Sequence, residues 1–212
     1  MAELTLVEAT RLAAPVVAGL NYAGIALFAA SGALAAAEKR QTLVTFAFFA
    51  LVTGTGGGTV RDVLIGAPVF WLQEPLYLAV CLVAALLVWI TPRHWWRPKA
   101  LDWLDAVGMS SFAVYGAAKA LGFGVAPLAA IAMGVFTACL GGIMRDLLAG
   151  EPSILLRPEI YVTAAVLASA SFVVLIACGV MLPVAALVSA GAGFALRGVA
   201  IRYGLGLPVY RD

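Results

Sequence analysis

The 212-residue sequence has little charge, since only 11% of its residues are Asp, Glu, Lys or Arg and 64% are hydrophobic. Soluble domains carry about 25% charged residues, so this chain lacks the polar surface of a water-soluble domain. Its net charge of +2 gives no electrostatic footprint for nucleic acid. The composition therefore excludes a large soluble catalytic domain, a disordered chain and a nucleic-acid-binding protein.

Cysteine and histidine are also scarce. Cys81, Cys139 and Cys178 lie in separate apolar runs without a CxxC motif, so we expect buried thiols that behave as small hydrophobic side chains. The single histidine, His94, has no neighbouring ligands for a metal site. The sequence also lacks HExxH, GxSxG and any nucleophile–base set. We therefore expect no metal, no cofactor and no enzymatic activity.

Long hydrophobic stretches fill the chain instead, and its mean hydropathy is +1.04. A membrane-spanning helix needs about 20 mainly apolar residues. Short breaks rich in glycine, proline or charge separate seven such stretches, at 15–37, 42–66, 75–91, 101–121, 125–149, 159–181 and 183–203. The sequence thus predicts one all-α, polytopic membrane domain over residues 1–212, with seven transmembrane helices.

Lysine and arginine are unequally distributed over the predicted loops. Arg11 alone falls on the side of the N-terminus, whereas the other side carries Lys39, Arg40, Arg93, Arg97, Lys99, Arg157, Arg202 and Arg211. Cytoplasmic loops carry the excess of positive charge. We therefore predict a multi-pass protein with its N-terminus outside and its C-terminus in the cytoplasm.

An internal repeat divides the predicted helices into two halves. A shift of 84 positions places residues 57–68 on 141–152, where seven of the twelve residues are identical, and it also pairs Thr53 with Thr137. Each repeat holds three spans, an odd number, so the second enters the membrane with opposite polarity and the repeats are inverted. The expected parts are repeat one at about 15–91, repeat two at about 101–181 and an extra helix at about 183–203.

Glycines interrupt the second and fifth predicted spans. The set of interest comprises Thr53, Gly56, Gly57 and Gly58 in the second span and Gly141 and Gly142 in the fifth. Each glycine inside a helix costs ~1 kcal/mol relative to alanine, so we expect a kink or a local unwinding, facing protein or a watery cavity. Close helix packing through small residues is the alternative interpretation.

Charged residues inside the predicted spans are the second candidate set, namely Arg61, Asp62, Lys119, Arg145 and Asp146. Such residues usually face the bundle interior or a watery cavity and pair with one another. Because adjacent helix residues point about 100° apart, we expect Arg61 to pair with another helix, for example through Asp146 or a carbonyl freed by a glycine. The alternative is that the arginines extend to the membrane surface near the span ends, which the short aspartates cannot do. Lys119 matches Ala35 in the other repeat; it either lines a watery path or extends to the membrane surface. Asp102 and Asp105 are interpreted as structural residues near a helix N-terminus.

The two Gly-Gly-x-x-Arg-Asp motifs, in two three-span repeats followed by a seventh span, resemble the trimeric intracellular cation (TRIC) channels. The likeness is closer to the prokaryotic branch, to which small bacterial proteins labelled glycine-transporter-like are related. The resemblance implies a homotrimer in contact with membrane lipid, in the inner (plasma) membrane of a prokaryote. Each subunit would hold a pore permeable to potassium, and sodium is a second candidate ion.

The resemblance also implies that the second and fifth helices kink at Gly56–Gly58 and Gly141–Gly142 and line the pore. The remaining candidates, Thr53, the two Arg-Asp pairs and Lys119, would then line or gate it. The sequence departs from the pattern at Leu140, which stands where the first repeat has Gly56. The alternative function is secondary transport of a small solute, because inverted repeats with broken helices suit alternating access equally well.

Overall fold

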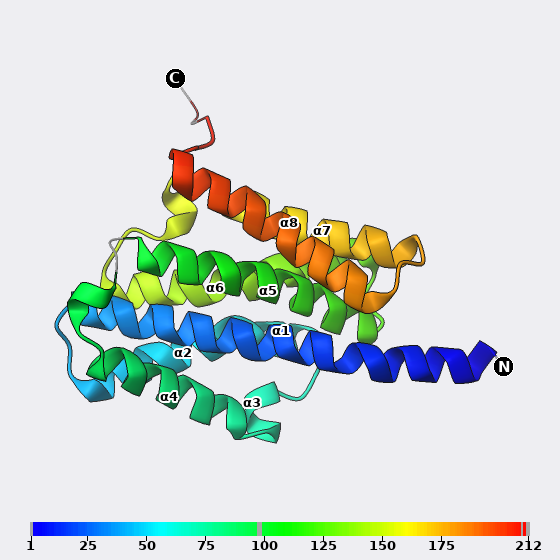
Figure 1. The fold of residues 1–212 in the computed structure, drawn as a ribbon, viewed down its shortest axis with the longest axis horizontal. Helices are drawn as coiled ribbons and strands as arrows, with labels where there is room; N and C mark the ends of the chain where they lie inside the picture. The colour runs from blue at the N-terminus through cyan, green and yellow to red at the C-terminus, as the bar shows by residue number, and fades with distance from the viewer. Residues whose placement is uncertain (1, 97–98, 209, 211–212) are drawn as a thin grey trace.

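The computed structural model describes residues 2–96, 99–208 and 210, without the side chains of residues 2–14 and 93. Four of the basic residues used above to predict orientation, Arg11, Arg93, Arg97 and Arg211, therefore lie outside the described residues or have side chains that do. The long helices run side by side, and the two ends of the chain lie at opposite ends of the bundle (Figure 1).

The described residues form long helices joined by short turns. The elements are α1 (Ala2–Glu38), α2 (Leu43–Leu64), α3 (Phe70–Gln73), α4 (Leu76–Ile90), η1 (Arg93–Trp95), α5 (Ala100–Gly122), α6 (Pro127–Ala149), η2 (Ile154–Leu156), α7 (Val162–Ala177) and α8 (Leu182–Tyr203). Except for the start of α1, the long helices begin and end within about four residues of the hydrophobic stretches. The short helix α3 was not expected.

Within the part of the chain that the structure describes, four helical segments are long and apolar enough to cross a membrane: Pro15–Glu38 of α1, together with α2, α6 and α8. The apolar helices α4 and α7 are shorter, at 15 and 16 residues. Helix α5 is long enough but carries Asp102, Asp105 and Lys119. These charges require partners inside the bundle if α5 also lies in lipid.

Helix ends follow from the local sequence. Thr42 caps α2, because its Oγ1 accepts a hydrogen bond from the N–H of Thr45 at 3.4 Å. Pro127 occupies the first turn of α6, where its missing N–H costs nothing. Gly150 and Gly204 end α6 and α8 with φ of 67° and 66°, a left-handed conformation that favours glycine.

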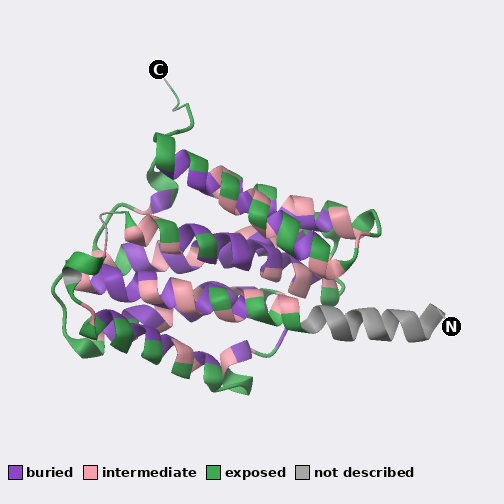
Figure 2. Cartoon of the chain, in the orientation of Figure 1, coloured by how far each residue is buried: buried purple, intermediate pink, exposed green. Residues whose placement is uncertain are grey.

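The core lies where the two halves of the chain meet. Helix α1 packs against α2, α4 and α5, and α2 packs against α6. The rings of Phe28 and Phe112, which are 84 positions apart, stack at this interface with centroids 5.1 Å apart. Buried residues lie mainly where helices face one another, and exposed residues lie along the outer faces of α4 and α8 (Figure 2). Those outer faces carry large apolar side chains such as Leu87 and Leu187, as expected of a surface in lipid.

Two of the three cysteines are buried, but Cys178 is exposed. The prediction of a third buried thiol is wrong because α7 ends at Ala177, earlier than the end of the apolar run. Cys178 consequently lies in the turn between α7 and α8.

Candidate functional site

The first cluster of buried charges lies at the C-terminal end of α2. Arg61 donates two hydrogen bonds to Oδ1 of Asp62, from Nε at 2.9 Å and from Nη2 at 2.8 Å. Nζ of Lys119, on α5, donates to the same oxygen at 2.8 Å. The N–H of Phe70, the first residue of α3, donates to Oδ2 of Asp62 at 3.0 Å. One buried carboxylate is therefore bonded to two cations.

Aromatic rings cover the Arg61 guanidinium. Its Cζ lies 4.9 Å from the ring centroid of Tyr115 and 6.0 Å from that of Phe70, distances at which an aromatic ring attracts a cation. Trp71 fastens α3 in place, because its Nε1 donates to Oγ1 of Thr59 on α2 at 2.9 Å. Helix α3 thus closes this end of the cluster.

The second cluster lies at the C-terminal end of α6 and is bonded in the same way. Arg145 donates to Oδ1 of Asp146 from Nε at 2.9 Å and from Nη2 at 2.8 Å, and the N–H of Ile154 donates to Oδ2 at 2.8 Å. Nη1 of Arg145 also donates to Oδ1 of Asp105 at 2.5 Å and to Oγ of Ser31 at 3.1 Å. One buried guanidinium is therefore bonded to two carboxylates.

The two clusters share their local geometry but have opposite formal charge. Under the 84-residue shift, Lys119 corresponds to Ala35, Asp105 to Asn21 and Tyr115 to Ser31. Because of these exchanges, the first cluster has two cations and one carboxylate, and the second has one cation and two carboxylates. Asp105 and Lys119 lie 14 residues apart on α5, a separation of ~21 Å along a helix axis.

The pairing expected for Arg61 is wrong. It bonds to its sequence neighbour Asp62 and not to Asp146 on another helix, and Arg145 likewise bonds to Asp146. The angle between adjacent Cβ directions argues against such a pair, but the long arginine side chain bends back so that Nε and Nη2 both reach one oxygen. Contacts between the two halves are still present: Lys119 bonds to Asp62, and Arg145 bonds to Ser31.

Asp105 is the functional candidate that sequence reasoning missed. It lies in the second turn of α5 and was interpreted as a residue of the helix N-terminus, yet it is 1% exposed and paired with Arg145. A signal was available, because the equivalent position in the first repeat is Asn21. A polar residue at the same place in two apolar helices indicates a buried polar contact.

Helices α2 and α6 cross in backbone contact at their glycines. A Cβ on Gly57 would collide with the carbonyl oxygen of Thr137, and a Cβ on Gly141 would lie 2.5 Å from that of Thr53. Both helices are continuous through these positions, so the expected local unwinding is wrong for this structure. Here the glycines permit close packing, which was the alternative interpretation.

The other predicted glycines face side chains. A Cβ on Gly56 would meet Sδ of Met144 at 2.5 Å, and one on Gly58 would meet the Phe70 ring at 2.7 Å. A Cβ on Gly142 would lie 3.2 Å from the Tyr161 hydroxyl, next to the second cluster. Gly58 therefore lies next to the first charge cluster, whose Arg61 is covered by Phe70, and Gly142 lies next to the second.

Thr53 lies at the centre of the crossing and is completely buried. Its Oγ1 has no hydrogen-bond partner among the described residues, whereas Oγ1 of the equivalent Thr137 donates to the carbonyl of Met133 at 2.6 Å. A buried hydroxyl without a partner is costly. It is also the kind of group that can contact a polar species passing between the helices.

A polar cavity of about 330 Å³ opens beside the second cluster, between the ends of α1 and α6 and the start of α5. Ala35, Asp105 and Asp146 are among the residues that line it. Asp146 is 7% exposed, whereas Asp62 in the first cluster is 0% exposed. The second carboxylate is therefore the more accessible one.

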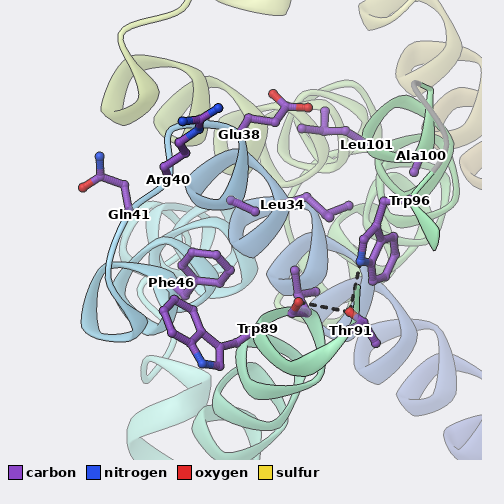
Figure 3. A pocket seen from close by; sticks show the side chains of 12 residues that line it. Leu34, Glu38, Arg40, Gln41, Phe46, Trp89, Thr91, Trp96, Ala100 and Leu101 are labelled. Carbon is purple, nitrogen blue, oxygen red and sulfur yellow. Dashed lines mark hydrogen bonds between the residues drawn. The ribbon is translucent and has the colours of Figure 1, made fainter. Parts of the chain in front are cut away.

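A larger cavity, of about 510 Å³, adjoins the polar 330 Å³ cavity, and Glu38 and Leu101 line both cavities. Its aromatic wall includes Trp89 and Trp96, and Nε1 of Trp96 donates to Oγ1 of Thr91 at 3.0 Å (Figure 3). Because neither Arg-Asp pair lines this cavity, we place the candidate site at the two clusters and the polar cavity.

Comparison with known proteins relates the whole arrangement to one family. A family model described as a glycine transporter matches residues 18–93 and again residues 102–177, two matches that begin 84 residues apart. A UPF0126 membrane protein of Vibrio cholerae serotype O1 is 38% identical over 197 residues, which are 90% of this chain and 81% of that protein. The UPF0126 inner membrane protein YadS of Escherichia coli K12 is 42% identical over 70% of this chain and 73% of its own length.

A solved structure extends the likeness to the fold. The TRIC trimeric intracellular cation channel orthologue from Rhodobacter sphaeroides superposes with a TM-score of 0.83, is 44% identical, and aligns over 90% of this chain and 99% of its own. The resemblance expected from the two Gly-Gly-x-x-Arg-Asp motifs is confirmed. The protein is an all-α membrane protein that belongs to the family of the UPF0126 membrane proteins and the prokaryotic TRIC channels.

Proposed function

We propose that the protein is a monovalent cation channel of the bacterial inner membrane, with potassium as its main permeant ion. It assembles as a homotrimer in contact with membrane lipid, and each protomer holds its own pore. Seven spans form two inverted three-helix repeats and an extra helix, and no enzymatic activity is involved. The proposal rests on the 44% identity to a cation channel orthologue and on oppositely charged clusters at the two ends of one helix crossing.

The path runs between the two clusters, along α2 and α6. In the present structure these helices touch at Gly57 and Gly141, so we assign it to a closed conformation. Opening requires the two helices to separate at the crossing, which exposes backbone carbonyls and Thr53 Oγ1. Carbonyl and hydroxyl oxygens are the groups that replace the hydration shell of a permeating cation.

The competing hypothesis is a secondary transporter of a small solute, which the description of the matching family model favours. Recording from purified protein in planar bilayers separates the two hypotheses. Unitary current steps with a reversal potential set by the potassium gradient support the channel. Saturable counterflow of radiolabelled glycine without current steps would replace it with the transporter.

We propose that Lys119, in the first cluster, takes part in the voltage-dependent opening of the pore. Its ammonium bonds to Asp62 and its side chain is 17% exposed, so it lies between the buried pair and the outside of the bundle. A charge that crosses the whole membrane field changes energy by ~2.3 kcal/mol per 100 mV. If Lys119 moves through part of that field, Lys119→Gln flattens the dependence of open probability on voltage.

The measurement is open probability against voltage for Lys119→Gln, for wild type and for Lys99→Gln. Lys99 is the matched control because it bonds to the backbone carbonyl of Ile201 and not to an Arg-Asp pair. We expect Lys99→Gln to keep the wild-type voltage dependence. A wild-type curve for Lys119→Gln would remove Lys119 from gating.

The orientation proposed from the positive-inside rule is testable with native cysteines. Cys178 lies in the turn between α7 and α8. Figure 1 shows this turn at the end of the bundle opposite the α1–α2 turn, which contains Lys39, and the start of α5, which Lys99 precedes. We expect a membrane-impermeant maleimide to label Cys178 in intact cells and to leave the buried Cys81 and Cys139 unlabelled. Cysteine placed by Tyr210→Cys in a Cys178→Ser background should react only after lysis. The reverse pattern would invert the proposed topology.

A further inference from the structure

The second charge cluster carries one more buried negative charge than its residues neutralise. Asp105 is 1% exposed and Asp146 is 7% exposed, and both carboxylates bond to the single guanidinium of Arg145. Oδ2 of Asp105 has no hydrogen-bond partner among the described residues. An uncompensated buried charge is strongly unfavourable, so a further positive charge would stabilise this cluster.

The first cluster indicates where that charge would lie. There, the ammonium of Lys119 bonds to Asp62 Oδ1 at 2.8 Å, alongside the two bonds from Arg61. At the second cluster the residue equivalent to Lys119 is Ala35. Ala35 lines the 330 Å³ cavity together with Asp105 and Asp146, so the cavity occupies the place that corresponds to the lysine side chain.

The surroundings of the cavity also attract cations. Five acidic residues line it against three basic ones, and the acidic residues are Glu38, Asp102, Asp105, Asp146 and Glu151. One of the basic residues, Lys39, is already bonded to Glu151 across the rim. The electrostatic potential inside the cavity is therefore negative, which attracts cations.

We propose that this cavity is a binding site for one monovalent cation, held by Asp146 and Asp105 in the place that the Lys119 ammonium takes at the other cluster. A single positive charge balances the cluster. A divalent ion would leave the cluster, which has two carboxylates and one guanidinium, with an excess positive charge. The site deepens the proposed channel function, on which its role as an ion reservoir at the pore mouth rests.

Binding is measured on the purified full-length protein by thermal unfolding, followed through tryptophan fluorescence. Potassium chloride is compared with N-methyl-D-glucamine chloride at equal ionic strength, because the organic cation is too bulky to take the place of a single potassium ion between the two carboxylates. A ligand that binds only the folded state raises the melting temperature. At ten times the dissociation constant we expect a rise of about 3–6 °C in potassium.

Two variants test the site in opposite ways. Asp105→Asn removes the excess charge, so its melting temperature should be equal in the two salts. Ala35→Lys supplies a tethered ammonium in place of the ion, and should be as stable without potassium as wild type is with it. Glu74→Gln, the same kind of change at an exposed carboxylate bonded to Tyr22, should keep the full response to potassium.

The proposal is wrong if wild type melts at the same temperature in both salts, or if calcium or magnesium stabilises it and potassium does not. Wild type can melt at one temperature in both salts while Asp105→Asn melts at a higher temperature than wild type, by the same amount in each salt. In that case a proton on Asp105 balances the cluster. Conduction is measured separately. If potassium raises the melting temperature but the protein shows no unitary currents, the cation site stands and the channel function is rejected. If the protein shows unitary currents but potassium does not raise the melting temperature, the channel function stands and the cation site is rejected.

Discussion

Replacing Arg145 with methionine is expected to destabilise the folded protein by about 3–5 kcal/mol, because it leaves buried carboxylates without their cation. Among the described residues, Arg145 is the charged side chain that donates to both Asp105 and Asp146. Methionine has a similar length, so the loss of packing is small by comparison. The measurement is the melting temperature of protein in detergent, together with the yield of monodisperse protein on size exclusion.

A double variant separates stranded charge from lost packing. Adding Asp105→Asn to Arg145→Met removes one of the two stranded carboxylates and should recover part of the lost stability. Arg202→Met changes an exposed arginine and should alter stability by less than about 0.5 kcal/mol. Equal losses in Arg145→Met and Arg202→Met would mean that the second cluster does not stabilise the fold.

Replacing Gly57 with leucine is expected to prevent normal packing of α2 against α6. Even the Cβ of the new side chain would overlap the carbonyl oxygen of Thr137, and that backbone is held inside a continuous helix. Neither partner can move aside as a flexible side chain would. We expect Gly57→Leu to yield no monodisperse protein. For Gly57→Ala we expect the folded protein to lose about 1–3 kcal/mol of stability, the range for overpacking a core.

Gly191 provides the matched control on α8. A Cβ there meets nothing within 4 Å, so Gly191→Ala should stabilise the helix by about 0.5–1 kcal/mol. Opposite signs for Gly57→Ala and Gly191→Ala would establish that backbone contact, and not helix propensity, requires the glycine at the crossing. A well-folded Gly57→Leu protein would show that the helices are separated in the membrane.

The helices could be predicted because their signals are local. Runs of apolar residues ended by Gly66, Pro92, Gly150 and Pro183 are enough to place the long helices to within a few residues. The repeat shift of 84 residues predicts which positions correspond, because Arg-Asp and glycine matches are rare in an apolar chain. Neither inference requires knowledge of how the helices pack.

The contacts within the site could not be predicted so easily. The Arg61–Asp62 pair depends on how one long side chain bends, which Cβ directions do not specify. The role of Asp105 depends on which helix lies across from it, and only the packed structure supplies Arg145 as its neighbour. The glycine runs allow either a bend or a close crossing from sequence alone, and the position of the facing carbonyl decides between them.

The pairing of adjacent Arg61 and Asp62 also bears on how the chain enters the membrane during synthesis. Helix α2 leaves the ribosome with both members of the ion pair, so it can pass into lipid as a neutral segment without waiting for a partner. Helix α5 lacks this advantage, because Asp105 is synthesised 40 residues before Arg145. A lone aspartate costs about 2.5–3.5 kcal/mol at a helix centre on the translocon scale, and this is an upper limit for Asp105 in the second turn of α5. Helices α5 and α6 are therefore expected to leave the translocon together, as a hairpin, whereas α2 can leave it alone.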